Sequence, residues 1–183
     1  MLHQAETAHL MLIDVQERLF PVIHDGEAMC ANALRLVRGA AILGVPVTVS
    51  EQYVKGLGAT LAPLRAVAPD APRFEKMHFS AARNDAIRDH VARLAINGRD
   101  HLVLAGIEAH VCVLQTALDF IAQGHNVTVV ADAVASRTPA NHRLALDRLA
   151  RAGAHVASTE MVLFEWTRVA GTERFRAISK LIK

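Results

Sequence analysis

Three residues able to take part in acyl-transfer chemistry each come at or after the end of a strand-like segment of the chain: Asp14, Lys76 and Cys112. They supply a carboxylate, an amine and a thiol. In open α/β sheets the ligand crevice lies beyond the carboxyl ends of the strands, so residues directly after strand-like runs are expected to face it. We therefore expect these three side chains to converge at one edge of a sheet.

The thiol of Cys112 is expected to act as a nucleophile. The helix predicted to begin beside it would favour the thiolate through its unpaired N–H groups and the positive end of its dipole, and so lower the pKa of the thiol. The alternative is that Cys112 is a small buried apolar residue, which is the commoner role of a single cysteine. Cys30 lies deep in another predicted helix, with no charged partner at an equivalent spacing, and is interpreted as a core residue.

Asp14 and Lys76 are the expected partners of this thiol. A carboxylate held beside it can accept the thiol proton and later return it to a leaving amine. The amine of Lys76 would stabilise the carboxylate and offset the charge of a thiolate. Each residue has a simpler alternative, because Asp14 could cap a helix or lie in a solvated turn, and Lys76 could be a surface lysine.

Apolar runs of strand length alternate with segments of helical periodicity. Continuous hydrophobicity without alternation is typical of strands covered on both faces of a parallel sheet. The expected strands are Leu10–Ile13, Pro46–Ser50, Arg73–Lys76, His101–Ala105, Val127–Ala131 and His155–Ala157. The expected helices are Ala28–Leu43, Ala81–Ile96, Val111–Gln123, Pro139–Ala152 and a C-terminal pair that begins near Glu160 and Thr172. This repetition predicts a doubly wound α/β layer structure.

Length and composition predict one compact domain over residues 1–183, because 52% of the residues are hydrophobic. The 20 Lys and Arg nearly balance the 18 Asp and Glu, and no basic run is present, which argues against a nucleic acid partner. Two cysteines are too few for a disulfide framework and favour a reduced, cytoplasmic protein. Neither a signal-peptide pattern nor a membrane-spanning apolar stretch is found.

Several segments, in register, resemble the isochorismatase-like hydrolases, and the resemblance runs over nearly the whole chain. It is closest to the small single-domain branch that contains the isochorismatase domain-containing and YcaC-like proteins. The matching segments are Leu12–Glu17, Glu51–Gly58, Lys76–Ser80, Gly106–Thr116, Val130–Arg137 and Thr159–Glu165.

This resemblance implies a three-layer α/β/α sandwich whose six-stranded parallel sheet has the order 3-2-1-4-5-6. It carries an Asp, Lys, Cys catalytic triad over onto Asp14, Lys76 and Cys112. It also implies a cis peptide between Ile107 and Glu108, with the backbone N–H groups of Glu108 and Cys112 directed at a developing oxyanion.

Two departures from other branches of this superfamily narrow the expected chemistry. Members that cleave the vinyl ether of isochorismate typically have a small residue in place of the thiol, which this chain retains, so acyl transfer is favoured. Nicotinamidases carry an Asp and two His metal ligands before the catalytic lysine, but the matching stretch here, residues 50–60, has no histidine. No metal and no cofactor are expected, since His78, His110, His125 and His142 form no ligand spacing.

We therefore expect a cysteine-dependent hydrolase that acts on a small amide or related acyl substrate through a thioester acyl-enzyme. Two alternatives remain open: an isochorismate-type vinyl ether hydrolase that uses the Asp alone, and a non-catalytic oligomeric binding module. A nucleotide-binding domain is disfavoured because no Gly-x-Gly-x-x-Gly follows the first strand.

The substrate pocket is expected to involve side chains that follow strand ends or lie in the glycine-containing loop after the second strand. These candidates are Gln16, Phe20, Tyr53, Leu57, His78 and Phe79, all of which could instead be packing residues. A homo-oligomer is also expected, with apolar C-terminal residues such as Met161, Phe164 and Trp166 either at a subunit contact or in the core.

Overall fold

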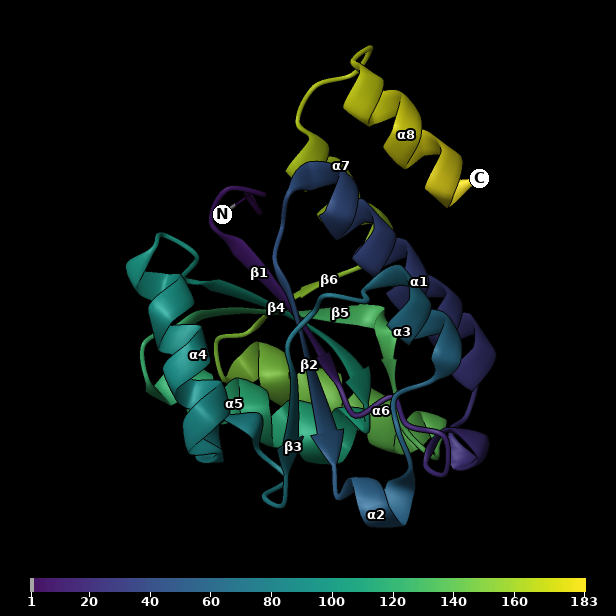
Figure 1. Ribbon diagram of the computed structural model, residues 1–183, viewed down its shortest axis with the longest axis vertical. Helices are drawn as coiled ribbons and strands as arrows, with labels where there is room; N and C mark the ends of the chain where they lie inside the picture. Colours follow the sequence, from purple (N-terminus) through teal and green to yellow (C-terminus); the bar gives the residue numbers. More distant parts are fainter. Residues whose placement is uncertain (1) are drawn as a thin grey trace.

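Six strands form one sheet in the computed structural model, which describes residues 2–183 (Figure 1). All neighbouring strands are parallel, and their order is β3-β2-β1-β4-β5-β6. The strands are β1 (Ala8–Ile13), β2 (Val47–Gln52), β3 (Arg73–Lys76), β4 (His101–Ile107), β5 (Asn126–Ala135) and β6 (His155–Ala157). The fold class and strand order expected from the sequence are confirmed.

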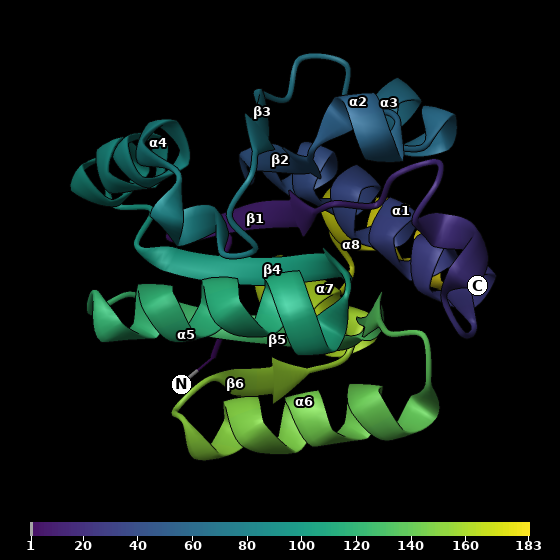
Figure 2. The same cartoon turned by 90° about the horizontal axis from the view of Figure 1, so that it is seen from below.

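Helices cover both faces of this sheet, as Figure 2 shows. One side carries α1 (Gly26–Leu43), α3 (Ala62–Val67), α7 (Thr159–Thr167) and α8 (Glu173–Ile182). The other side carries α4 (Asp85–Ile96), α5 (Leu114–Ala122) and α6 (Pro139–Arg151). Each side has its own apolar core against the sheet, which gives the expected three layers. No helix within residues 2–183 is both long and apolar enough to cross a membrane.

The main differences from the sequence predictions lie in three segments, and β5 also continues to Ala135, beyond its predicted end at Ala131. The stretch after β2 contains two short helices that the sequence did not predict, α2 (Val54–Leu57) and α3. The helix expected at Ala81–Ile96 is a 3-10 turn followed by α4, because the Asn84 side chain caps α4 by accepting the N–H of Ile87. The helix expected to start at Val111 starts at Leu114, after a π-helical turn.

The strand order reverses between β1 and β4, at the centre of the sheet. Every residue of these two strands is buried, which accounts for their mostly apolar sequences. Such a reversal is where open α/β folds place their ligand site, beyond the carboxyl ends of the strands. The residues that follow β1 and β4 are therefore the first candidates for a functional site.

Gly106 lets β1 and β4 approach closely at this reversal. Its φ is +122°, and a Cβ atom there would lie 2.1 Å from the carbonyl oxygen of Ile13. Neither the backbone angle nor the spacing admits a larger residue. The glycine thus brings the residue after β1, Asp14, beside the turn that follows β4.

Candidate active site

Asp14 and Lys76 form a buried ion pair at the carboxyl edge of the sheet. Asp14 directly follows β1 and has a left-handed backbone with a φ of 52°, a conformation that Asp tolerates better than most residues. Lys76, the last residue of β3, donates from Nζ to Asp14 Oδ2 at 2.7 Å, and both side chains are fully buried. The hydroxyl of Ser50 donates to the other carboxylate oxygen at 2.7 Å.

The ammonium group of Lys76 has a full set of acceptors. Besides Asp14, it donates to Gln52 Oε1 at 2.7 Å and to the carbonyl oxygens of Phe79 at 3.0 Å and His78 at 3.3 Å. Because an ammonium group has only three N–H donors, these oxygens use all of them. Lys76 is therefore held as an electrostatic partner of Asp14 and has no donor left for a substrate.

Gln16 fixes the position of Gln52. Its Oε1 accepts from the Gln52 backbone N–H at 2.7 Å, and its Nε2 donates to the Gln52 carbonyl at 3.0 Å and the Gly58 carbonyl at 2.6 Å. The side chain is fully buried. Gln16, expected in the substrate pocket, thus holds the loop after β2 and, through Gln52, the ammonium group of Lys76.

Cys112 lies in the π-helical turn Ala109–Val113 between β4 and α5, and it is 5% exposed. Burial, and next the negative charge of Asp14, raise the pKa of its thiol to about 12 against the opposing effect of Lys76. The charges of Asp14 and Lys76 therefore both act on the pKa of this thiol, in opposite directions. The prediction of a lowered thiol pKa was wrong, because Cys112 precedes α5 and the loss of solvent outweighs the effect of a helix end.

Glu108 organises the same turn. The peptide bond between Ile107 and Glu108 is cis. The Glu108 carbonyl accepts from the N–H groups of Val111 at 3.0 Å and Val113 at 3.2 Å. Its buried carboxylate pairs with Arg137, whose Nε and Nη2 donate to the two oxygens, each at 2.9 Å. The turn that carries Cys112 is thus tied down at its first residue.

This arrangement can support nucleophilic chemistry at a thiol. A protonated sulfur next to a buried carboxylate can lose its proton to that carboxylate as it attacks an electrophile. The neighbouring ammonium group compensates the carboxylate charge before and after the transfer. No group of three or more His, Cys, Asp or Glu side chains within residues 2–183 is arranged to hold a metal ion.

The remaining pocket candidates lie in different surroundings. The ring of Phe20 lies against Gly26 at the start of α1. Tyr53 is 43% exposed and its ring packs over Gly56, while Leu57 is half-buried in α2. His78 and Phe79, whose carbonyls contact Lys76, line a surface cavity of about 520 Å³. Cys112 is not part of the lining of that cavity.

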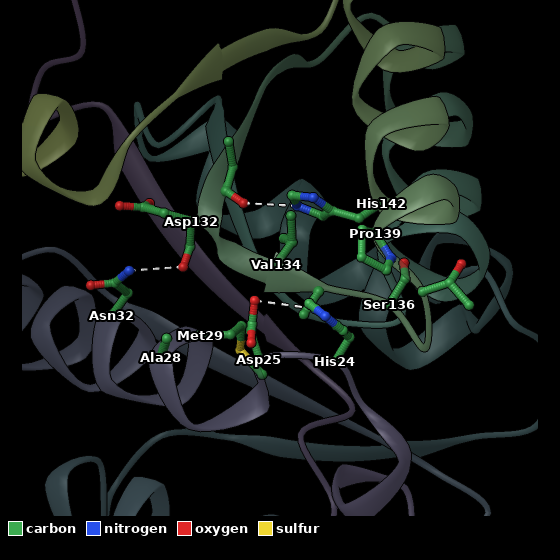
Figure 3. Close-up of a pocket in the computed structure, with 13 residues that line it drawn as sticks. His24, Asp25, Ala28, Met29, Asn32, Asp132, Val134, Ser136, Pro139 and His142 are labelled. Carbon is green, nitrogen blue, oxygen red and sulfur yellow. Dashed lines mark hydrogen bonds and ion pairs between the residues drawn. The ribbon is translucent and has the colours of Figure 1, made fainter.

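A separate cavity of about 270 Å³ lies between the first turns of α1 and α6 and the end of β5 (Figure 3). His142 donates from Nε2 to the Ala131 carbonyl at 3.0 Å, and Asn32 donates to the Asp132 carbonyl at 2.9 Å. Both contacts hold α1 and α6 against β5. Asp14, Lys76 and Cys112 are absent from its lining, so this cavity is distinct from the site described above.

Sequence reasoning missed three polar residues that contact the candidate site: Ser50, Gln52 and Arg137. Ser50 and Gln52 alternate at the carboxyl end of β2, so a search for polar residues at that strand end could have found them. Arg137 follows β5 in the same way. Its pairing with Glu108, however, joins segments 29 residues apart and leaves no trace in the spacing.

The family model described as "Isochorismatase domain" matches residues 7–161. The secreted isochorismatase effector Isc1 of Phytophthora sojae (strain P6497) is 39% identical over 95% of this chain and 83% of its own length. The isochorismatase domain-containing protein 1 of Danio rerio is 40% identical over 97% of this chain, which spans 61% of that relative's length.

Three solved structures share the fold over nearly all of both chains. The MAR1 ribonuclease of Caenorhabditis elegans has a TM-score of 0.91 and 33% identity, and covers 100% of this chain and 92% of its own. YcaC of Pseudomonas aeruginosa, described with hexane-2,5-diol and covalent acrylamide, has a TM-score of 0.90 and 25% identity, with 98% and 91% covered. YcaC of Escherichia coli, described as an octameric hydrolase of unknown specificity, has a TM-score of 0.91 and 25% identity, with 99% and 89% covered.

Proposed function

The chain belongs to the isochorismatase domain family of hydrolases, and from this premise we propose that it hydrolyses small amides or related acyl compounds with Cys112 as nucleophile. The observation that carries the proposal is the thiol placed beside the buried ion pair of Asp14 and Lys76. Because Cys112 is only 5% exposed, a small acyl group fits this site better than a bulky one.

The first half of the reaction transfers the acyl group to the enzyme. Asp14 takes the proton of Cys112 as the sulfur bonds to the carbonyl carbon of the substrate. The carbonyl oxygen then carries the negative charge, and the backbone N–H groups of Glu108 and Cys112 are the proposed donors to it. The carbon–nitrogen bond breaks, Asp14 returns the proton to the leaving amine, and a thioester remains on Cys112.

The second half releases the acid. Asp14 takes a proton from a water molecule as the water oxygen bonds to the thioester carbon. Asp14 then returns this proton to the sulfur when the carbon–sulfur bond breaks. Lys76 keeps its proton throughout, because its role is to balance the charge of Asp14 and of the departing sulfur. The thiol pKa of about 12 fits a thiol that stays protonated until a substrate is bound.

The YcaC structure with covalent acrylamide supports a nucleophile in this fold, since acrylamide forms adducts with nucleophilic side chains. Cleavage of a vinyl ether, as in isochorismate, would need only the acid–base function of Asp14. It remains the second candidate, and it predicts activity without the thiol. The C. elegans relative is described as a ribonuclease, but the nearly balanced charge of this chain argues against a nucleic acid substrate.

We also propose that the protein is a homo-oligomer and that it works in a reducing compartment such as the cytoplasm. The octameric YcaC of E. coli supports the first proposal, as do the exposed apolar side chains of Tyr53, Met77 and Phe79 beside the site. The need for a free thiol at Cys112 supports the second. The molar mass of the protein, measured by light scattering after size-exclusion chromatography, tests the homo-oligomer. A mass equal to that of one chain would contradict this proposal.

The proposal is tested by screening small amides, ureides and thioesters against the wild type, Cys112→Ala and Cys112→Ser. We expect turnover by the wild type, a loss on the order of a thousandfold or more in both variants, and an acyl adduct on the Cys112 peptide by mass spectrometry. Cys30→Ala is the matched control, because Cys30 is also buried but lies in α1. Isochorismate turnover that survives in Cys112→Ala would replace this proposal with the vinyl ether reaction.

A further inference from the structure

We propose that Arg137 is a positioning residue that holds the nucleophile turn, residues 108–113, so that the Glu108 N–H stays directed at the acyl oxygen of a bound substrate. Arg137 does not touch the reacting atoms and acts only through Glu108. The inference rests on the proposed function, because it concerns the oxyanion of that acyl transfer.

Glu108 lies just beyond the support of the sheet. The ladder between β4 and β5 ends with the pair of Ile107 and Ala135, one residue before Glu108. From there on, side chains join the two strand ends. Arg137, two residues after the end of β5, bonds both oxygens of the Glu108 carboxylate at 2.9 Å.

The burial of this pair is uneven. The Glu108 side chain is 6% exposed, whereas that of Arg137 is 61% exposed. A buried carboxylate needs donors for its oxygens, and the planar fork of arginine supplies two at a fixed angle. Because both oxygens are held, the carboxylate cannot rotate freely, and the orientation of the whole Glu108 residue is restricted.

Glu108 also contacts the turn that carries Cys112. The Glu108 carbonyl accepts from Val111 and Val113, the residues on either side of Cys112. Glu108 thus contributes its N–H to the proposed oxyanion site and its carbonyl to the turn around the thiol. A displaced Glu108 would therefore move its N–H relative to the thiol, and acylation needs the donor and the thiol in register.

A second contact joins the same two segments. His110 Nδ1 lies 3.0 Å from the hydroxyl of Ser136, which is 1% exposed. The Ser136 carbonyl also accepts from the N–H of His24 at 3.0 Å. The segment of Ser136 and Arg137 is therefore anchored itself, and it can brace the turn from the β5 side.

Two reactions of the thiol separate positioning of an oxyanion donor from general damage to the site. A nitrophenyl acetate ester acylates sulfur at its carbonyl carbon, charge develops on the carbonyl oxygen, and nitrophenolate leaves. A haloacetamide alkylates sulfur at a saturated carbon and loses halide, so no charge develops on oxygen. Only the first reaction needs the donor that Arg137 is proposed to position.

The experiment measures both rates at Cys112, by peptide mass spectrometry, in the wild type, Arg137→Ala, Arg137→Lys and Glu108→Gln. We expect Arg137→Ala to lower the acylation rate about tenfold or more and to leave the alkylation rate unchanged. Arg137→Lys should recover only part of the loss, because lysine keeps the charge without the fork. Glu108→Gln should lose acylation in the same direction as Arg137→Ala, since it weakens the same pair.

The control is Arg88→Ala. Arg88 is an exposed arginine of α4 that also pairs with carboxylates, those of Asp85 and Asp89. It should change neither rate. Equal loss of acylation and alkylation in Arg137→Ala, or no loss of acylation, would overturn the inference. Absence of any acyl adduct at Cys112 in the wild type would instead overturn the proposed function, and this inference with it.

Discussion

The ion pair of Asp14 and Lys76 concentrates two opposite charges in a fully buried position. Their mutual attraction offsets the cost of removing each charge from water only while both are present. Ser50 and Gln52 add hydrogen bonds that satisfy the remaining oxygen and N–H groups. The pair is therefore expected to be sensitive to loss of either partner.

Lys76→Met should lower the free energy of unfolding by about 3–5 kcal/mol, because it leaves the Asp14 carboxylate buried and uncompensated. The double variant Asp14→Asn with Lys76→Met should recover much of this loss, since no buried charge remains. Urea denaturation of the wild type, the two single variants and the double variant measures both effects. Equal stability of Lys76→Met and the double variant would contradict the buried-charge explanation.

The thiol of Cys112 should stay protonated through the neutral range when no substrate is present. Burial, and next the Asp14 carboxylate, raise its pKa to about 12. The rate of Cys112 alkylation should therefore still be rising at about pH 10, above the ordinary thiol pKa of about 8.5. The measurement is made in a Cys30→Ala background, because burial raises the pKa of the Cys30 thiol too. A plateau near neutral pH would show that the helix end dominates after all.

At the level of elements, the close approach of β1 and β4 depends on Gly106. Gly106→Ala should cost about 2–6 kcal/mol, from the unfavourable φ together with the overlap of the new methyl group with the Ile13 carbonyl. It should also disturb Asp14, the next residue after Ile13. Thermal or urea unfolding measures the stability, and the acylation rate reports on the site.

Gly98→Ala separates the two contributions. Gly98 also has a positive φ, +84°, but a Cβ atom there meets nothing within 4 Å. This variant should show only the smaller, conformational cost. A Gly106→Ala variant no less stable than Gly98→Ala would mean that the two strands can separate without penalty.

For the whole molecule, four histidines lie near the amino ends of the strands, opposite the candidate site, and three of them, His3, His9 and His101, are buried. His9 Nε2 and His90 Nε2 both contact the hydroxyl of Thr48, at 2.7 and 2.9 Å. His3 and His101 contact the hydroxyl of Thr128 in the same way, at 2.7 and 2.8 Å. A single hydroxyl can donate to one ring and accept from the other, so each bridge suits at least one neutral imidazole.

Acid should therefore destabilise the fold. Burial, aided by neighbouring positive groups, lowers the pKa of His9 to about 3 and of His101 to about 4, from 6.5. The unfolded chain thus binds more protons than the folded one below about pH 6.5, and stability falls as the pH falls towards about 4, by up to about 1.4 kcal/mol per pH unit for each histidine.

Urea unfolding at several pH values tests this effect. The double variant His9→Gln with His101→Gln should lose stability less steeply between about pH 6.5 and 4.5 than the wild type. His24→Gln is the control, because the His24 side chain is about half exposed. Parallel pH profiles for the double variant and the wild type would show that other groups, such as carboxylates, control the acid sensitivity.

The sequence by itself determined the layered α/β fold, the strands β3 and β6 to the residue and the centres of the others. It did so because apolar runs and glycines at helix ends are local patterns, which depend only on residues close together in the sequence. The same logic placed Asp14, Lys76 and Cys112 at or after the ends of strands that a parallel sheet aligns at one edge. The residues next to a position in the sequence are enough to predict whether it lies at the end of a strand.

Tertiary structure alone decided what surrounds those residues. The acceptors of Lys76, the interior role of Gln16 and the pairing of Glu108 with Arg137 all join segments that are separate in sequence. Burial of Cys112 likewise reversed the expected direction of its pKa shift. Burial and long-range contacts depend on how elements pack, and no spacing along the chain encodes them.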